Sequence, residues 1–325
     1  ATILDGGRIS DVVVKNLLIK SSRHSTIGMI VSEMRNSAVI QRVLADESCE
    51  IRLINQSYVG GLVGEFTHTD VFAPKDENGD TIIGAALVSV LDSTNSTPIV
   101  VVGSGDSTAA GLVGRANLGN STFKFELVVS NCVNYADITP DENLVSTSNF
   151  HIAGLVGERE YNNNVDAGVL LVCDCINYGD IYTMGNSGFY AGFLAYTYRA
   201  AKSTFYRCVN KGKIGGLLTP QNEPMTNGVA GGFIASLELY AANPMSFYDC
   251  ANYGDVSCGL DAGGFLGRAT GNGGHTLAFS FVNCANYGEI STNNAEPTNL
   301  GQAFVGLDVG MEHGTCTITV SNCLF

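Results

Sequence analysis

A tyrosine and an acidic residue recur two positions apart in the chain, each time at the same distance after a cysteine. These residues are Tyr135 and Asp137, Tyr178 and Asp180, Tyr253 and Asp255, and Tyr287 and Glu289. Aromatic rings beside carboxylates can bind sugars, and a carboxylate pair could also hydrolyse a glycosidic bond. Tyrosine favours strands, however, and a periodic placement is typical of a surface stripe rather than a catalytic centre. We therefore predict no catalytic residue.

Few other residues form a pattern that supports chemistry. The five histidines lie outside any nucleophile or metal signature, and segments 68–70 and 76–80 lack the ligand spacing of zinc and calcium sites. The glycine-rich phrases described below lack the Lys-Ser/Thr pair of a phosphate-binding loop. We therefore predict no metal site and no cofactor. Three Asn-x-Ser/Thr sequons, at Asn55, Asn95 and Asn120, would be N-glycosylated only in a secreted eukaryotic chain.

Two short phrases alternate along the sequence and indicate stacked units. The first reads approximately Cys-x-Asn-x-Gly-x-Ile, and its copies begin at Cys132, Cys175, Cys208, Cys250, Cys284 and Cys323, the last reaching only Phe325. The second reads small-Gly-apolar-apolar-small, and the second residue of its eight copies stands at positions 28, 61, 111, 154, 192, 232, 264 and 303. Fixed phrases at an uneven period are typical of a solenoid whose insertions lie in loops.

The residues around each cysteine predict strands and a bend. Apolar residues alternate up to three positions before the cysteine, as on one face of a strand. The alternation breaks at the preceding residue, which is Asn131, Asp174, Arg207, Asp249, Asn283 or Asn322. This break predicts a bend or bulge. We expect three short strands per coil: one before the bend, one carrying the cysteine phrase and one carrying the glycine phrase.

Stacked coils should align like residues in ladders about 4.8 Å apart. The expected inward ladders are Cys132, Cys175, Cys208, Cys250 and Cys284, and Asn134, Asn177, Asn210, Asn252 and Asn286, with the asparagine amides bonding from coil to coil. The tyrosine and acidic residues should form outward ladders. Like carboxylates in one ladder repel, and Lys213 falls between Asp180 and Asp255, where it could relieve that repulsion.

The ten cysteines fit this repeat better than a disulfide framework. A buried free cysteine packs as a small apolar residue, so we expect the ladder thiols to be inert. Cys49, Cys173, Cys258 and Cys316 lie off the ladder and are better candidates for disulfides. Strand alternation places Cys173 and Cys175 on one face unless the bend intervenes.

Together, the two phrases resemble the GLUG repeat, a glycine-rich motif of extracellular surface proteins. The resemblance covers roughly residues 27 to 325 and rests on eight glycine phrases in register with the cysteine phrase. It implies a cell-surface, adhesin-like or very large secreted protein, generally without assigned catalytic residues.

Composition and charge narrow the class of protein further. A net charge of −14 disfavours binding to nucleic acid, and we find no apolar run approaching the ~18 residues of a membrane helix. A start at Ala1 without a signal region is consistent with a processed chain. We predict an all-β fold, a right-handed parallel β-helix (β-solenoid) of about seven to eight irregular coils. It forms one continuous domain over residues 27–325, cut within a repeat, while residues 1–26 cap one end or donate a strand.

The expected function is that of a non-enzymatic structural or adhesive protein, extracellular or on the cell surface. It would assemble with itself through the solenoid ends, or form part of a longer surface array that contacts surface proteins or glycans. A glycan-binding module that uses the tyrosine and acidic residues is the alternative, and a polysaccharide-active β-helix enzyme is the third possibility.

Overall fold

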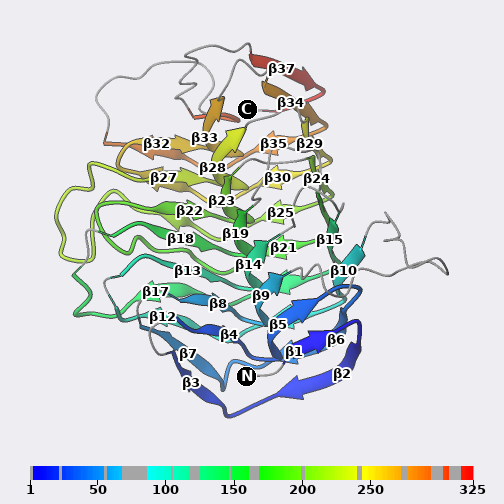
Figure 1. The fold of residues 1–325 in the computed structure, drawn as a ribbon. Helices are drawn as coiled ribbons and strands as arrows, with labels where there is room; N and C mark the ends of the chain where they lie inside the picture. The colour runs from blue at the N-terminus through cyan, green and yellow to red at the C-terminus, as the bar shows by residue number, and fades with distance from the viewer. Residues whose placement is uncertain are drawn as a thin grey trace.

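The computed structural model describes residues 3–21, 24–54, 57–67, 86–103, 105–117, 125–145, 148–160, 168–198, 202–239, 244–271, 277–293, 303–306 and 316–324. The regular structure within these residues is entirely β, and the strands pair in parallel with the equivalent strands of neighbouring coils. Figure 1 shows the coils stacked in sequence order between the two termini. The prediction of an all-β, parallel, solenoid-like fold is confirmed.

The largest sheet, sheet I, has 15 strands and contains the bend predicted before each cysteine. Its strands are β2 (Arg8–Val14), β6 (Val39–Ala45), β10 (Ala86–Leu91), β11 (Thr94–Asn95), β15 (Phe125–Ser130), β16 (Val133–Asn134), β20 (Val169–Cys173), β21 (Ile176–Asn177), β24 (Ser203–Tyr206), β25 (Val209–Asn210), β29 (Met245–Tyr248), β30 (Ala251–Asn252), β34 (Leu277–Val282), β35 (Ala285–Asn286) and β37 (Cys316–Ser321). All six residues at the predicted bend have a left-handed backbone, with φ between 48° and 54°. The bend is therefore confirmed, and it separates β15 from β16 and their equivalents.

Sheet II follows the cysteine phrase and consists of two parts. Its strands are β3 (Leu18–Lys20), β7 (Glu50–Leu53), β12 (Ile99–Val101) and β17 (Ile138–Pro140), then β26 (Ile214–Gly215), β31 (Val256–Cys258) and β36 (Ile290–Thr292). Isolated parallel bridges from Ile181 to Ile138 and to Ile214 connect the two parts.

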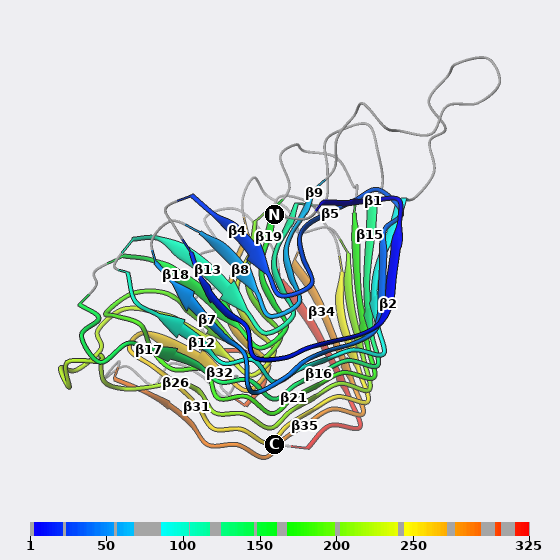
Figure 2. The same ribbon diagram turned by 90° about the horizontal axis from the view of Figure 1, so that it is seen from below.

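Sheet III contains the strands that lead into the glycine phrases, and sheet IV contains the strands that lead out of them. Sheet III consists of β4 (Thr26–Gly28), β8 (Tyr58–Gly60), β13 (Ser107–Ala110), β18 (Phe150–Ala153), β22 (Phe189–Ala191), β27 (Val229–Gly231) and β32 (Asp261–Gly263). Sheet IV consists of β1 (Ile3–Asp5), β5 (Val31–Arg35), β9 (Val63–Thr67), β14 (Val113–Asn117), β19 (Val156–Glu160), β23 (Leu194–Tyr198), β28 (Ile234–Leu239) and β33 (Leu266–Gly271). Figure 2, which looks along the stack, shows sheets III and IV meeting at a corner from which they diverge.

The prediction of three strands per coil is wrong, because each phrase contains a corner. In the coil of Cys132, the cysteine phrase is divided between β16 and β17. The side chain of Asn134 bonds the backbone of Ala136 two residues on, and such local bonding turns the chain. The glycine phrase does not form a strand of its own, since in the second to seventh copies its second and third residues connect sheet III to sheet IV. The first copy was predicted one residue out of register, because Gly28 lies in β4 and pairs with Gly60.

The N-terminal segment lies at one end of the stack. Strands β1, β2 and β3 pair in parallel with β5, β6 and β7 of the next coil. Asp11, Arg42 and Asp92 share the left-handed backbone of the predicted bend, with φ of 61°, 52° and 49°. The coil geometry therefore extends into residues whose sequence lacks the cysteine phrase. The division of the chain at residue 26 stays a prediction.

The buried core changes in composition along the stack. The third residue of the glycine phrase is Leu62, Leu112 and Leu155 in the first coils and Phe193, Phe233 and Phe265 in the later ones, all buried. The residue three positions before the cysteine changes likewise, from Val90, Val129 and Val172 to Phe205, Phe247 and Phe281. Rings within each column stack at 4.5–5.0 Å, as for Phe193 on Phe233 and Phe205 on Phe247. The two columns meet edge to face, a favourable aromatic geometry.

Candidate functional site

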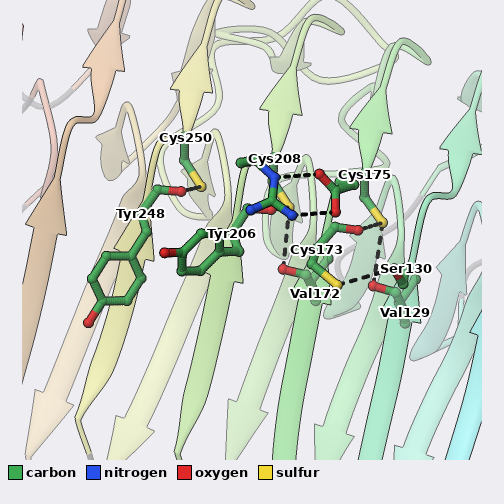
Figure 3. Close-up of polar contacts among 11 residues, drawn as sticks. Val129, Ser130, Val172, Cys173, Cys175, Tyr206, Cys208, Tyr248 and Cys250 are labelled. Atoms are coloured by element: carbon green, nitrogen blue, oxygen red, sulfur yellow. Dashed lines mark hydrogen bonds and ion pairs between the residues drawn. The ribbon is translucent and has the colours of Figure 1, made fainter.

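The predicted cysteine ladder is present and closed to solvent. The thiols of Cys132, Cys175 and Cys208 each lie 3.2–3.5 Å from two carbonyl oxygens, one in the same coil and one in the preceding coil. Figure 3 shows three of the ladder thiols beside these carbonyl groups. Burial raises the pKa of Cys175 well above its usual value. All five ladder cysteines are at most 1% exposed, so reagents in solvent do not reach their thiols in the folded chain.

The cysteines of the described residues, with the side chain of Cys316 lying outside them, are all free thiols. The expected disulfides at Cys49, Cys173 and Cys258 are therefore not formed. The left-handed backbone of Asp174 reverses the alternation, so that Cys175 is buried whereas Cys173 is partly exposed beside Ser130. Burial also raises the pKa of Cys258, to about 12.

The asparagine ladder is also confirmed, and it is continuous through six coils. The amide nitrogens of Asn95, Asn134, Asn177, Asn210 and Asn252 each donate to the side-chain oxygen of the next asparagine, ending at Asn286, over 2.8–3.1 Å. From Asn134 onward each amide also donates to the carbonyl two residues later in its own chain segment. These bonds satisfy side chains that have almost no solvent exposure.

The two repeated phrases are in direct contact, which explains why they occur together. In the six coils that contain the asparagine ladder, the corner glycine of the glycine phrase packs against it: these are Gly61, Gly111, Gly154, Gly192, Gly232 and Gly264. A Cβ added at Gly192 would lie 2.2 Å from the carbonyl oxygen of Gly232 and 2.6 Å from Oδ1 of Asn210. The corner therefore points inward, and only a residue without a side chain fits there.

This ladder overturns one predicted modification site. Asn95 is fully buried and its amide nitrogen donates to Asn134, so the folded chain does not present it for N-glycosylation. Asn55 and Asn120 lie outside the described residues.

The predicted tyrosine and acidic residues do form outward columns, but most of their binding groups already have partners. Tyr135 stacks on Tyr178 at 4.9 Å, and Tyr253 stacks on Tyr287 at 4.6 Å. Lys211 lies over the ring of Tyr178 at 4.8 Å, on the side of the next coil. Each of these rings therefore has one face covered by a neighbouring ring, and Tyr178 has both faces covered, which reduces the ring faces on which a sugar could stack.

The carboxylates of this column bind the backbone of the next coil. Oδ1 of Asp137 accepts from the N–H of Asp180 at 2.8 Å, and Oδ1 of Asp180 accepts from the N–H of Lys213 at 2.7 Å. Oδ1 of Asp255 accepts from the N–H of Glu289 at 3.1 Å. These bonds offset the repulsion between stacked carboxylates and give the column a structural role.

A cleft of about 510 Å³ lies between the outward side chains of sheet III and Glu158 of sheet IV. Its lining is polar and includes His24, Thr26, Ser57, Tyr58, Asp106, Ser107, Thr108, Asn149, His151 and Glu158. Two rows of outward side chains meet at this cleft, and of the row on sheet IV only Glu158 lines it. Tyr58, Thr108 and His151 are in register on sheet III, and Glu65, Arg115 and Glu158 are in register on sheet IV.

Hydrogen bonds and charges connect the two rows of the cleft. Glu158 accepts from Thr108 at 3.1 Å and lies 3.3 Å from Nδ1 of His151. Burial alone would raise the pKa of Glu158. The hydrogen bond and charge of His151, the charge of Arg115 and the hydrogen bond of Thr108 together outweigh burial, so the pKa of Glu158 is lowered. Glu65 differs, because its burial outweighs the charge of Arg115 and raises its pKa.

Sequence reasoning missed this cleft. Its rows consist of the residue two positions before each glycine phrase and the residue directly after it. The residue types change from coil to coil, so no repeated letter marked them. Continuous strand alternation would not have found it, because positions seven residues apart point to opposite faces; the corner within the glycine phrase shifts the phase and turns both outward.

No family model matches the chain, and comparison with curated proteins and with solved structures found no match. The resemblance to the GLUG repeat stays a prediction. Among the described residues, no group of three or more His, Cys, Asp or Glu side chains is placed to hold a metal ion. The same part of the chain contains no helix long and apolar enough to cross a membrane.

Proposed function

We propose that the chain is a non-enzymatic, extracellular or cell-surface repeat protein that assembles end to end as a structural or adhesive rod. The proposal includes a right-handed solenoid of about seven to eight coils related to GLUG-repeat proteins. Repeat architecture supports such a role, because stacked coils make an elongated body that grows by adding units.

The observation that carries this proposal is the exposed core surface of the last strand. Ile318 and Val320 of β37 are 46% and 44% exposed, whereas their partners in the preceding coil, Phe279 and Phe281, are buried. The side chains that form the core elsewhere therefore face solvent here. Covering them with another coil would remove apolar surface from water, at about 25 cal/mol per Å².

The proposed cover is a further coil, supplied by a second copy of the chain or by more repeats of a longer surface array. At the opposite end of the stack, the inward side chains of Val12, Val14 and Ile19 are only partly buried, whereas their partners Val43, Ala45 and Ile51 in the next coil are buried. The two ends differ, so contact between them is head-to-tail, and an arrangement of this kind continues as a filament unless it closes into a ring. Parallel edge strands at each end supply the unpaired backbone groups for such a contact.

The outward acidic column supports the non-enzymatic part of the proposal. The carboxylates of Asp137, Asp180 and Asp255 are held by backbone N–H groups of the next coil. The same backbone contact recurs from coil to coil, as expected of a structural surface stripe rather than of a single catalytic pair. Buried ladder thiols also suit an extracellular chain, because burial protects them from oxidation.

Electron microscopy of the purified chain across a concentration series tests the assembly. We expect filaments that lengthen with concentration. Val320→Lys should prevent them, because it places a charge on the exposed core surface, whereas Thr319→Lys on the other face of β37 should not. Isolated rods at every concentration, or identical filaments from both variants, would contradict the proposal.

A further inference from the structure

We propose that the cleft between sheets III and IV is a binding site for an uncharged saccharide. This site lies apart from the ends of the stack and from the tyrosine column, so it goes beyond the assembly proposed above. Its volume of about 510 Å³ is within the range of about 300–1,000 Å³ that is typical of sites for small ligands.

The chemistry of the lining selects hydroxyl-rich ligands. The hydroxyl protons of Ser107 and Thr108 are donated to the carbonyl of Gly105 and to Glu158, so these oxygens accept from a ligand, as does the carboxylate of Asp106, whereas the amide nitrogen of Asn149 donates. Saccharide hydroxyls also donate and accept, so each can pair with such groups. Tyr58 adds an aromatic ring, supported on one side by the guanidinium of Arg115 at 4.4 Å.

The charges in the cleft argue against anionic ligands. The lining contains two acidic residues, Asp106 and Glu158, and no lysine or arginine. The nearby Arg115 is already bound to Glu65 at 3.2 Å. A sulfated or uronic saccharide would therefore meet carboxylates without a cation to balance its own charge.

A peptide is a poorer fit than a saccharide. Extended peptides gain affinity by pairing with a free strand edge. The walls of this cleft are instead the faces of β8, β13 and β18, whose backbone groups pair with neighbouring coils. A ligand here contacts side chains alone, which favours one that carries many hydrogen-bonding groups of its own.

His151 is held in position for such a ligand. Its Nδ1 faces Glu158, and its ring packs on Tyr196 at 4.7 Å and on Phe189 at 5.3 Å. Phe189 and Tyr196 stack on each other at 5.1 Å across the angle between the sheets. This aromatic cluster closes the cleft toward the C-terminal coils and leaves Nε2 of His151 as the ring nitrogen for the ligand.

Glu158 is a positioning residue in this arrangement. It accepts from Thr108 and orients the imidazole of His151, so it acts on the ligand through that ring. At the rim, Oδ1 of Asp106 accepts from the backbone N–H of Asn149 at 2.9 Å. The other carboxylate oxygen of Asp106 remains for a ligand hydroxyl.

A glycan array with neutral, cationic, sulfated and uronic oligosaccharides, followed by calorimetric titration of the captured compounds, tests the proposal. We expect capture of neutral oligosaccharides, and at least tenfold weaker binding for His151→Ala and for Asp106→Asn at an unchanged melting temperature. Asp106→Asn keeps the size of the side chain, so it still tests the cleft if His151→Ala fails to fold correctly. Tyr253→Ala, in the tyrosine column, is the control and should bind normally.

Three results would overturn the proposal: no capture of neutral compounds, preference for charged ones, or binding lost in Tyr253→Ala but kept in the cleft variants. Filament formation is measured separately on Val320→Lys. Failure of the saccharide site is therefore distinguishable from failure of end-to-end assembly.

Discussion

Asn177→Asp changes one atom in the interior of the asparagine ladder and tests the ladder directly. The amide nitrogen of Asn177 donates to Oδ1 of Asn210 and to the carbonyl of Gly179, both at 2.9 Å. The substitution keeps the shape of the side chain but replaces this donor with an acceptor. Two buried acceptors lose their donor and face another oxygen.

The expected loss of stability follows from the two buried acceptors that lose their donor. Each buried acceptor left without its donor costs about 1–3 kcal/mol, so Asn177→Asp should lower the free energy of unfolding by about 2–6 kcal/mol at neutral pH. Asn286→Asp is the matched control. The amide of Asn286, at the last rung of the ladder, donates to the carbonyl of Gly288 at 3.0 Å, and losing this one bond should cost about 1–3 kcal/mol.

Urea denaturation of both variants and the parent, followed by circular dichroism, measures these losses. Burial raises the pKa of the introduced carboxyl, and its protonated form regains one donor, so the loss should shrink as the pH falls. Equal losses for the two variants, or a loss below about 1 kcal/mol for Asn177→Asp, would refute the role assigned to the ladder.

Three further predictions concern the surface, the cleft and the thiols. Lys213→Glu should lower the melting temperature more than Lys213→Ala, because both keep the backbone bond to Asp180 but only the first adds a like charge; equal melting temperatures would contradict this. The lowered pKa of Glu158 stabilises the fold above its unfolded value of 4.5, and this contribution is lost as the pH falls through the folded pKa. Acid titration of Glu158→Gln should therefore show a shallower loss of stability, and an unchanged profile would count against the His151 contact. A thiol reagent should label Cys173 rapidly in the folded chain and Cys175 only after unfolding, as mass spectrometry of the labelled peptides would show.

Much of the fold could be predicted because identical residues recur where the structure is most constrained. The asparagine and cysteine ladders and the bend before each cysteine were all predicted from the repeated phrases. Each depends on a local requirement: an amide that bonds its neighbours, a small apolar side chain, or a residue that tolerates a left-handed backbone. Such requirements leave the same residue types in every coil.

The features that the sequence did not predict lie at positions where the residue type varies from coil to coil, or where different residues produce the same geometry. In the first coils Val43 and Ser93 replace the cysteine, although Ser93 makes the same bond to a carbonyl two residues earlier, Leu91, at 2.5 Å. The glycine phrase was interpreted as a strand because apolar residues dominate it. Its corner depends on contact with Asn134 or its equivalents, which are distant in sequence. The cleft was missed for a related reason, since Thr108 and His151 share a position but not a residue type.

The change from leucine and valine to phenylalanine along the core means that the coils are not interchangeable. Both columns change within one coil, between Leu155 and Phe193 and between Val172 and Phe205. Duplicating a coil within either half would lengthen the rod without disturbing its interior. A leucine coil moved into the phenylalanine half would place a leucine beneath rings that stack at 4.5 Å and open a cavity. A phenylalanine coil moved into the leucine half would crowd its ring among smaller side chains. Gene duplications that extend this protein are thus expected to copy neighbours within one half.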